Sequence, residues 1–461
     1  MRIVISGVGE VGSHLAKMLS GASHDITVID DDPKRIEEVA GMADVITIEG
    51  DCTTFAVLKK AAVRKADLFI AVRPEESINI ISAVLAKQLG ARKAIVRIDN
   101  NEYLEPNNKE MFINMGIDYL FYPEKVAARE VINLLGHTST TEYVDFSGGK
   151  LSLVVFKLDA SSPLIGKSLL EATADRESLP YRTVAISREG ETIIPRGNDQ
   201  FQDGDTIYVI ANQDDVRSLM VFSGKPNIEV NNIMILGGSR IGVRIAAELQ
   251  EEANVKLVEY NPEKAYKLTE SLEKTLIISD DGRNIDSMIE EGLSNMDAFV
   301  AALSDKLIKY AMVLQSAAAF FSILILLRMV AKRLGVKKVI AEVENLNFIN
   351  LAESMGIDTI INKKLITASN IFRFTMNTDV QAIKCLTGCD AEVLEFIAKP
   401  NSLATKGQIR ELNFPQDAMI GGIVRGDRSY IATGSMQINA FDRVVVFSLP
   451  SAISRIGRFF N

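Results

Sequence analysis

Glycine residues close to the amino-terminal end have the spacing of a turn that binds nucleotide phosphates. Residues 7–12 read Gly-Val-Gly-Glu-Val-Gly and follow a short apolar segment, residues 2–6. In such a turn the first glycine permits a tight bend, the second lets a pyrophosphate approach the backbone, and the third lets a helix pack closely on the strand. The free amides at the start of that helix favour phosphate oxygens. Gly7, Gly9 and Gly12 therefore predict a nucleotide site.

An acidic residue at the end of the next apolar segment completes this pattern. Residues 26–29 are apolar and are followed by Asp30. A carboxylate at this position can accept hydrogen bonds from both ribose hydroxyls of an adenosine. Asp31 and Asp32 follow, and three carboxylates would repel a 2′-phosphate, so the sequence favours NAD over NADP. The alternative is a tight strand–helix turn in a Rossmann-like domain that binds no ligand.

A parallel sheet is needed to position these residues. Strand-like and helix-like segments alternate along residues 1–122, with short connections between them, which predicts a doubly wound parallel sheet. The predicted strands are residues 2–6, 26–29, 45–48, 67–72, 94–98 and 118–121. Such sheets bind ligands beyond the carboxyl ends of their strands. At or near those ends lie Asp30, Asp51, Val72, Arg73 and Arg97.

The same pattern returns in the second half of the chain. An apolar segment, residues 232–236, leads into Gly-Gly-Ser-Arg-Ile-Gly at residues 237–242, so that Ser239 stands in the position of the second glycine. Glu259 is the matching acid after the next strand, and Asp280 matches Asp51. After each Rossmann-like segment the character changes to short strands separated by turn residues. The chain is therefore predicted to be a tandem duplication.

The predicted fold class is α/β, with two Rossmann-like doubly wound parallel sheets, each followed by a small β-rich α+β domain. The predicted order is a first Rossmann-like domain (1–122), a linking helix (123–140), a small domain (141–222), a linker (223–230), a second Rossmann-like domain (231–365), a linking helix (366–377) and a second small domain (378–461).

The two copies differ in one region. Gly12 matches Gly242 and Ala71 matches Ala301, each 230 residues later, whereas Lys87 matches Lys332, 245 residues later. About residues 302–330 therefore diverge from their counterpart, which leaves it open whether the second crevice binds a nucleotide. Residues 317–327 within this region are almost entirely apolar, but they are too short to span a bilayer, so we expect a buried helix.

Composition excludes several functions. The formal net charge of −9 argues against nucleic acid as a main partner. The three cysteines make no disulfide framework and suggest a reducing compartment, and Cys385 and Cys389 lack nearby ligands, so we expect structural thiols and no metal site. The chain begins directly with a strand, which predicts no signal peptide. None of the three histidines follows a late strand, so no catalytic constellation is evident.

The order of four domains, together with the sequences GVGEVG, ITVID and EGD, resembles the TrkA family of tandem RCK proteins. The resemblance implies RCK N-terminal and C-terminal domains and a non-catalytic, cytosolic subunit at the inner face of the cell membrane. It implies binding of NAD(H), in several cases of ATP or ADP. It also implies assembly as a homo-oligomer, a dimer or tetramer that forms a ring, and gating of a membrane-embedded potassium-translocating subunit of the TrkH or TrkG type.

The resemblance also implies site residues. At the first crevice these are Gly7, Val8, Gly9, Glu10, Val11 and Gly12 in the turn, Asp30 for a ribose, and Asp51, Val72, Arg73 and Arg97 around the rest of the pocket. At the second they are Gly237, Gly238, Ser239, Arg240, Ile241, Gly242, Glu259 and Asp280. Family members often carry Thr or Ser where Arg73 and Pro74 stand here.

Two other functions stay open at this point. One is an NAD-dependent oxidoreductase with an unrecognised active site, and the other is a regulator of a different transporter or of a non-selective channel, since a sensing fold does not name its pore. In the small domains, Arg182, Arg188 and Arg196 have the charge needed to bind an anion. We nevertheless expect them to be solvent-exposed surface residues.

Overall fold

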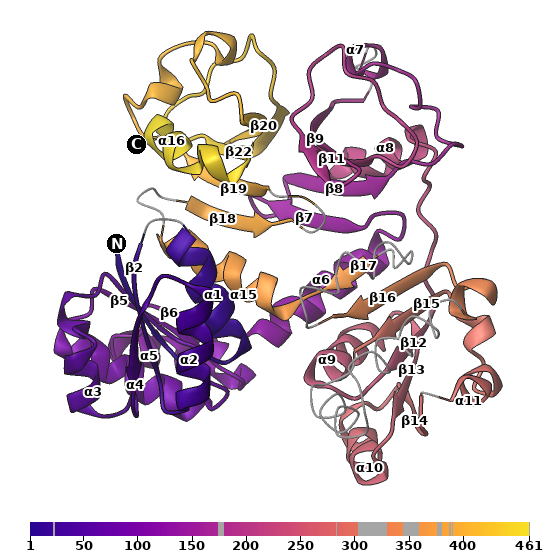
Figure 1. Ribbon diagram of the computed structural model, residues 1–461. Coiled ribbons are helices and arrows are strands. Elements are labelled where there is room, and N and C mark those ends of the chain that lie inside the picture. The colour runs from indigo at the N-terminus through magenta and orange to yellow at the C-terminus, as the bar shows by residue number, and fades with distance from the viewer. Residues whose placement is uncertain are drawn as a thin grey trace. The chain divides into compact units, whose positions relative to one another are not determined.

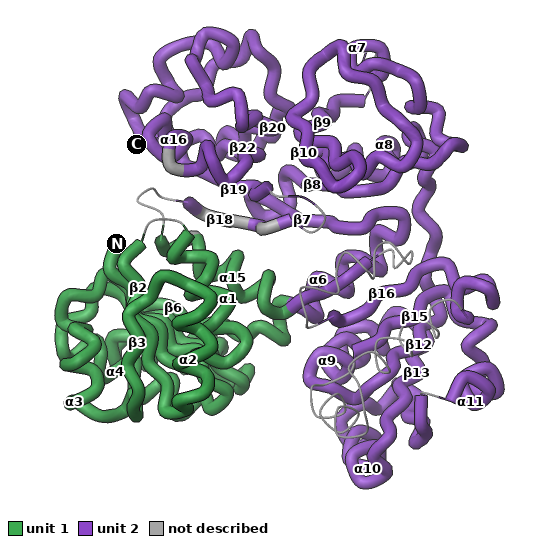
Figure 2. The backbone as a smooth tube through the Cα atoms, viewed as in Figure 1, with its two compact units in different colours: residues 1–126, 363–377 green, residues 127–362, 378–461 purple. Residues whose placement is uncertain are grey.

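The computed structural model describes residues 1–21, 24–173, 179–282, 284–302, 330–343, 359–375, 380–386, 389 and 391–460. These residues form two compact units, Met1–Val126 with Lys363–Asn377, and Ala127–Asn362 with Thr378–Asn461 (Figure 2).

The first unit contains a six-stranded parallel sheet. Its strands are β1 (Arg2–Ser6), β2 (Asp25–Asp30), β3 (Ile46–Glu49), β4 (Leu68–Ala71), β5 (Lys93–Arg97) and β6 (Tyr119–Phe121). Their order is β3-β2-β1-β4-β5-β6, so β1 lies between β2 and β4. This is where the strand order reverses, and ligands of open α/β sheets bind beyond the strand ends at such a point.

Helices alternate with the strands of this sheet (Figure 1). They are α1 (Glu10–Gly21), α2 (Pro33–Met42), α3 (Phe55–Lys60), α4 (Glu76–Leu89) and α5 (Pro106–Asn114). The strand β4 is apolar at every position and fully buried, because helices cover both faces of a doubly wound sheet. One core cluster joins Phe69 and Val96 of the sheet to Leu58 of α3 and Ala83 of α4.

The helix α15 (Lys363–Phe372) also belongs to the first unit, although it follows the second sheet in the sequence. It packs on α1 and continues into a short 3-10 turn, residues Arg373–Thr375. Figure 2 shows it in the same colour as the first Rossmann-like sheet. The helix begins at Lys363, three residues before the expected boundary at 366, and it groups with the other copy's sheet, which the sequence did not predict.

The second unit repeats the parallel sheet. Its strands are β12 (Asn232–Leu236), β13 (Asn254–Glu259), β14 (Leu276–Ser279), β15 (Ala298–Ala301), β16 (Lys338–Glu342) and β17 (Thr359–Ile361). The order β14-β13-β12-β15-β16-β17 is the order of the first sheet, which confirms the duplication. The helices of this sheet include α9 (Arg240–Leu249), α10 (Pro262–Ser271) and α11 (Ile285–Glu290). The predicted helix at 317–327 lies outside the described residues.

Two small antiparallel sheets complete the second unit. The first has the order β10-β9-β11-β8-β7 and the second has the order β18-β19-β22-β20-β21. Their strands are β7 (Glu142–Phe146), β8 (Leu151–Lys157), β9 (Tyr181–Arg188), β10 (Glu191–Ile193), β11 (Thr206–Asn212), β18 (Val380–Cys385), β19 (Glu392–Ile397), β20 (Ala418–Arg425), β21 (Arg428–Ile431) and β22 (Arg443–Ser448). The two sheets share one apolar core, in which Leu153 and Tyr208 pack with Val393 and Phe447.

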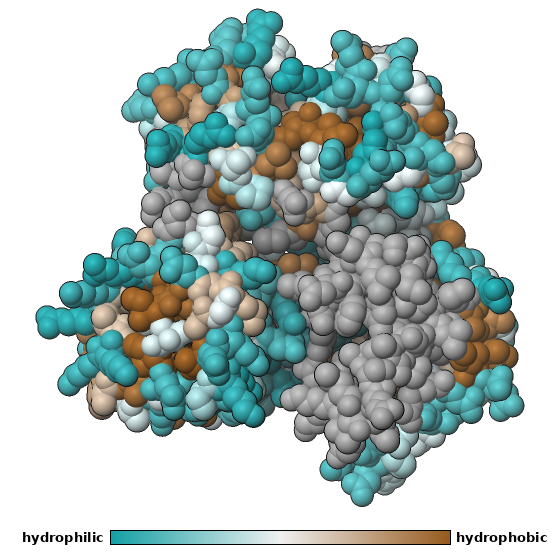
Figure 3. Space-filling view, in the orientation of Figure 1, coloured by the Kyte–Doolittle hydropathy of each residue, from teal (hydrophilic) through white to brown (hydrophobic). Residues whose placement is uncertain are grey.

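Helices connect and cover these sheets. The linking helix α6 (Pro123–Gly136) leads out of the first Rossmann-like domain, close to the range expected at 123–140. The small sheets carry α7 (Leu169–Ala172), α8 (Val216–Phe222) and α16 (Pro450–Phe460). Apolar residues are not confined to the cores: Figure 3 shows apolar surface on the first Rossmann-like domain, and its exposed side chains include Met42, Ile46 and Phe55.

Candidate functional site

Two glycines of the first turn are required by the protein's own packing. Gly7 has a φ of +95°, a left-handed conformation that side chains rarely adopt, and its amide donates to the Ile29 carbonyl at 2.9 Å. A Cβ on Gly12 would lie 1.8 Å from the Gly7 carbonyl oxygen. These two residues therefore let α1 start directly against β1.

Gly9 is different because none of the described residues lies where its side chain would be. A Cβ built on Gly9 would meet nothing within 4 Å. The residue immediately precedes α1, whose first amides have no carbonyl of the preceding turn to bind. Ser13 is the residue whose amide bonds back to the Gly9 carbonyl, at 2.9 Å. The open space and the amides together fit a phosphate group at this place.

Asp30 holds the turn in shape. Its carboxylate is fully buried and accepts hydrogen bonds from the Val8 amide at 2.7 Å and from the Asp32 amide at 3.0 Å. A ribose could bind this carboxylate only if the side chains that bury it moved aside. The ribose would then share the carboxylate oxygens with the two amides. The contact of Asp30 with a ribose therefore stays a prediction. The structure shows that this carboxylate also has a structural role, because it holds the turn in shape.

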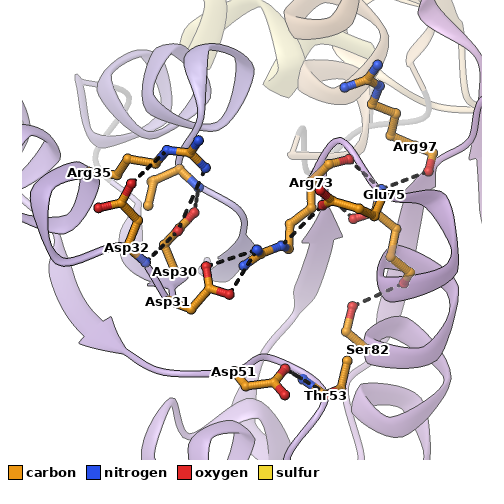
Figure 4. A network of polar contacts seen from close by, with 12 residues as sticks. Asp30, Asp31, Asp32, Arg35, Asp51, Thr53, Arg73, Glu75, Ser82 and Arg97 are labelled. Atoms are coloured by element: carbon orange, nitrogen blue, oxygen red, sulfur yellow. Dashed lines mark hydrogen bonds and ion pairs between the residues drawn. The ribbon is translucent and has the colours of Figure 1, made fainter.

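Arg73 crosses from the end of β4 to the end of β2 (Figure 4). One guanidinium nitrogen lies 2.9 Å and 3.0 Å from the two carboxylate oxygens of Asp31. The stem of Arg73 lies against Gly7, since a Cβ on Gly7 would be 2.6 Å from the Arg73 Cγ. Burial by itself would raise the pKa of Asp31, but the hydrogen bond and charge of Arg73 outweigh it and lower that pKa.

The acidic residues after β2 all make contacts within the protein. Asp32 caps α2 by accepting from the Lys34 amide at 3.0 Å, and Arg35 approaches it to 3.4 Å. Asp30 is buried, and Asp31 pairs with Arg73. The preference for NAD over NADP, which the charge of these three carboxylates predicts, stays a prediction.

Asn79 is a buried residue that sequence reasoning missed. Its side chain accepts from the Arg73 amide at 2.8 Å and donates to the carbonyls of Arg73 and Arg97, at 2.8 Å and 3.0 Å. It therefore ties the ends of β4 and β5 to α4. The sequence signal that could have found it is an asparagine on the apolar face of this helix, and the structure shows that the position is fully buried.

Other predicted residues of the first crevice have different surroundings. The Arg97 guanidinium points away from Asp31 and Arg73 in Figure 4 and lies 3.3 Å from Asp99 and 3.4 Å from Glu124. Asp51 is exposed and accepts from the amide and hydroxyl of Thr53, both at 2.8 Å. Val72 is buried, and its amide donates to the Ser6 carbonyl at 2.9 Å.

The second turn has the same framework of hydrogen bonds as the first. The Gly237 amide donates to the Val258 carbonyl at 2.8 Å. The Glu259 carboxylate is buried and accepts from the amides of Gly238 and Asn261, at 3.0 Å and 2.9 Å. Glu259 thus has the structural role of Asp30.

The position of Gly9 is where the second turn departs from the first. Ser239 is the N-cap of α9, and its hydroxyl accepts from the Gly242 amide at 3.2 Å. A serine side chain thereby occupies one of the amides that a phosphate would use. Lys264 also lies 2.8 Å from Glu259. The hydroxyl of Ser239 therefore competes with an anion at the second turn, whereas the positive charge of Lys264 offsets that of Glu259 and would favour an anion.

The remaining predicted residues of the second crevice lie around this turn. Arg240 and Ile241 begin α9, and Ile241 is buried. Asp280 follows β14 and accepts from the Asp281 amide at 2.7 Å. The divergent segment after β15, residues 303–329, lies outside the described residues.

The described residues offer no second kind of site at the histidines or cysteines. Burial lowers the pKa of His14, His24 and His137, and it raises the pKa of the buried Cys52 thiol. No group of three or more His, Cys, Asp or Glu side chains among the described residues is arranged to hold a metal. The side chain of Cys385 lies outside the described set.

Two arginines of the small domains are bound within the protein. This differs from the prediction that they are solvent-exposed. Arg188 forms a two-pronged ion pair with the buried Asp205, at 2.7 Å and 2.8 Å, and Arg182 donates to the Ala432 carbonyl at 2.6 Å. The second small domain repeats the first pair with Arg425 and Asp442. Arg196 is exposed, as expected.

Across the parts of the chain that the structure describes, no helix has both the length and the apolar character needed to cross a membrane.

Comparison with known proteins places these features in context. The TrkA-N domain family matches residues 3–123 and 233–363, and the TrkA-C domain family matches residues 153–223 and 393–461. The Trk system potassium uptake protein TrkA homolog of Archaeoglobus fulgidus is 32% identical, and the alignment covers 100% of both chains. The Trk system potassium uptake protein TrkA of Halomonas elongata is 29% identical over 97% of this chain and 95% of its own length.

Solved structures show the same fold. The GsuK RCK domain matches with a TM-score of 0.60 at 16% identity, covering 97% of this chain and 92% of that chain. The GsuK channel bound to NAD matches with a TM-score of 0.60 at 15% identity, covering 98% of this chain and 78% of that chain.

Proposed function

The chain belongs to the TrkA family of Trk system potassium uptake proteins, and from this membership we propose that it is a nucleotide-sensing regulatory subunit. In this proposal it gates a separate, membrane-embedded potassium-translocating subunit of the Trk type. It binds NAD(H), with ATP or ADP as further ligands. It works on the cytoplasmic face of the membrane as a homo-oligomeric ring.

The observation that carries the proposal is the space at Gly9. Gly7 and Gly12 are explained by packing inside the protein, whereas a Cβ on Gly9 would meet no atom of the described part of the chain within 4 Å. A bare backbone facing open space at a helix start is what a pyrophosphate requires. The NAD-bound GsuK channel, which shares the fold, supports a dinucleotide as the ligand.

The ligand is proposed to lie mainly in the first crevice. We assign Gly7, Val8, Gly9, Glu10, Val11 and Gly12 to the phosphates, Asp30 to a ribose, and Asp51, Val72 and Arg73 to the surroundings. We assign Arg97 a supporting role, because its guanidinium is bound to Asp99 and Glu124. The second turn, with Gly237, Gly238, Ser239, Arg240, Ile241, Gly242, Glu259 and Asp280, is proposed to be a weaker site.

Gating then follows from unequal binding. A nucleotide shifts a two-state ring only if it binds one arrangement more tightly than the other, and equal binding would shift nothing. We propose no catalytic step, since no histidine among the described residues lies at the carboxyl end of a sheet strand. An oxidoreductase activity would be supported only by steady turnover of NADH with a small carbonyl substrate.

Calorimetry on Gly9→Ala tests the proposal. Since the new methyl group meets no protein atom within 4 Å, the fold should be unchanged, while the affinity for NADH should fall at least about tenfold because the methyl group occupies phosphate space. Gly41→Ala in α2 is a matched control, because its Cβ would also meet nothing within 4 Å. The same titrations with NAD, ADP and ATP rank the ligands.

Two results would contradict the proposal. One is wild-type protein that binds none of the four nucleotides, and the other is Gly9→Ala protein that binds NADH as tightly as wild type. If binding is found, potassium flux into vesicles that contain the membrane subunit should change on addition of the tightest ligand, and this change should be absent with Gly9→Ala.

A further inference from the structure

The helix α15 reaches the first crevice from the second half of the chain. At the end of this segment the rings of Phe374 and Tyr119 contact each other in a tilted arrangement, with centroids 4.9 Å apart, and the Lys93 ammonium nitrogen lies 6.0 Å from the centroid of the Phe374 ring. Tyr119 and Lys93 are the first residues of β6 and β5. The end of the α15 segment therefore lies at the amino ends of the strands, opposite the carboxyl ends where the ligand is proposed to bind. The start of α15 lies toward the carboxyl ends of the strands, and the helix packs beside α1 (Figure 1).

The first turn of α15 places a lysine at the glycine-rich turn. The Lys364 ammonium group lies 3.0 Å from a carboxylate oxygen of Glu10. The Lys364 side chain is 16% exposed, whereas that of Glu10 is 65% exposed. The lysine is therefore held in place by its surroundings, and the glutamate is free to move into solvent.

Glu10 is the first residue of α1, and its amide is one of those assigned to the phosphates. Its carboxylate beside a bound phosphate would be repulsive, unless a cation offsets it. One turn further along α1, burial lowers the pKa of His14, and the charge of Lys364 lowers it further. Lys17, near the middle of α1, is exposed.

We propose that Lys364 is a phosphate-binding residue of the first crevice, supplied by the second half of the chain, and that it exchanges Glu10 for a nucleotide phosphate when the crevice fills. This inference rests on the proposed function and specifies its ligand as a nucleotide with at least two phosphates. Because α15 follows β17 after a single residue, the exchange would act on the chain that leads out of the second sheet.

The test is calorimetry with ADP and NADH on full-length protein carrying Lys364→Gln, Glu10→Gln or both. Lys364→Gln should weaken ADP binding about tenfold and reduce its dependence on salt, because a charge-assisted contact is lost. Glu10→Gln should strengthen ADP binding by a few fold, because the competing carboxylate is gone. The double variant should bind ADP more tightly than Lys364→Gln, because no unpaired Glu10 carboxylate repels the phosphate, but less tightly than Glu10→Gln, which keeps the lysine. Lys364→Arg should keep most of the wild-type affinity.

Lys17→Gln is the matched control, since it also replaces one lysine by glutamine, here on the exposed surface of α1. This variant should bind ADP as tightly as wild type does. If the lysine only holds the helices together, Lys364→Gln and Glu10→Gln would lower the melting temperature alike and leave ADP affinity unchanged, and this result would overturn the assignment. Wild-type protein that binds neither nucleotide would overturn the proposed function, and this assignment with it.

Discussion

The two glycine-rich turns keep the same framework but differ at the position that faces a ligand. Gly7 and Gly237 make the same backbone bond, and Asp30 and Glu259 each accept one amide of their turn and one amide from two residues further along the chain. The first turn is open at Gly9, whereas the second carries Ser239, whose hydroxyl binds an amide of α9. The comparison separates what the fold needs from what a phosphate needs.

The acids of the two turns show how a framework tolerates change. Glu259 has one methylene more than Asp30, and its carboxylate lies 2.7 Å from the point that a Cβ on Gly238 would occupy. Val8 stands at the equivalent place in the first turn, where the shorter Asp30 leaves room for a side chain. Acid length and the neighbouring residue therefore changed together, and both turns kept their amide bonds.

The largest expected effect comes from glycines of the shared framework. Gly12→Ala would place a methyl carbon 1.8 Å from the Gly7 carbonyl oxygen, and Gly242→Ala would place one 2.2 Å from the Gly237 oxygen. Each should lower the apparent free energy of unfolding by about 3 kcal/mol, near the upper end of overpacking penalties. Urea unfolding checks this, with Gly9→Ala as the comparison. Equal losses for Gly9→Ala and Gly12→Ala would remove the distinction between the glycines.

The two acids should be equivalent for stability but not for binding. Asp30→Ala and Glu259→Ala each leave buried amides without acceptors, so each should cost about 1–3 kcal/mol of unfolding free energy. Only Asp30→Ala should also reduce NADH affinity in calorimetry, by tenfold or more. A comparable loss in Glu259→Ala would instead indicate that the second crevice is the main site.

Exchange of the ligand-facing residues should convert one turn toward the other. Ser239→Gly removes the hydroxyl that binds the Gly242 amide and should strengthen a weaker class of nucleotide binding by a few fold. The loss of stability should be only a few tenths of a kcal/mol, because glycine is also accepted at an N-cap. Calorimetric stoichiometry checks this. An unchanged second class would mean that residues beyond the turn close this crevice.

The smallest expected effect concerns the ion pair at the first crevice. Arg73 lowers the pKa of Asp31, so the pair stabilises the fold above the pKa of an unfolded aspartate, and this stability is lost as the pH falls through the lowered pKa. Asp31 is half exposed, which limits the effect of Arg73→Gln to less than about 1 kcal/mol at pH 7. Urea unfolding of both proteins at pH 7 and pH 3 should show the difference shrinking in acid. A difference that grows in acid would contradict the pairing.

Local sequence determined the parts of this protein that depend on short-range pattern. Alternating strand and helix segments, the glycine spacing and an acid after the second strand predict each parallel sheet, because a turn such as residues 7–12 has few other uses. The repeat at Gly242 and Glu259 predicted the duplication, and the structure confirmed it with the same strand order in both sheets.

Only the tertiary structure decided which residues meet across long distances in the chain. The pairing of Arg73 with Asp31, the turn of Arg97 toward Glu124, and the placement of Lys364 at Glu10 each depend on packing between separate elements. Sequence position put α15 with the second copy, yet the helix packs on α1 of the first. The physical reason is that an amphipathic helix specifies an apolar face but not its partner, and the geometry of the surrounding domains supplies that choice.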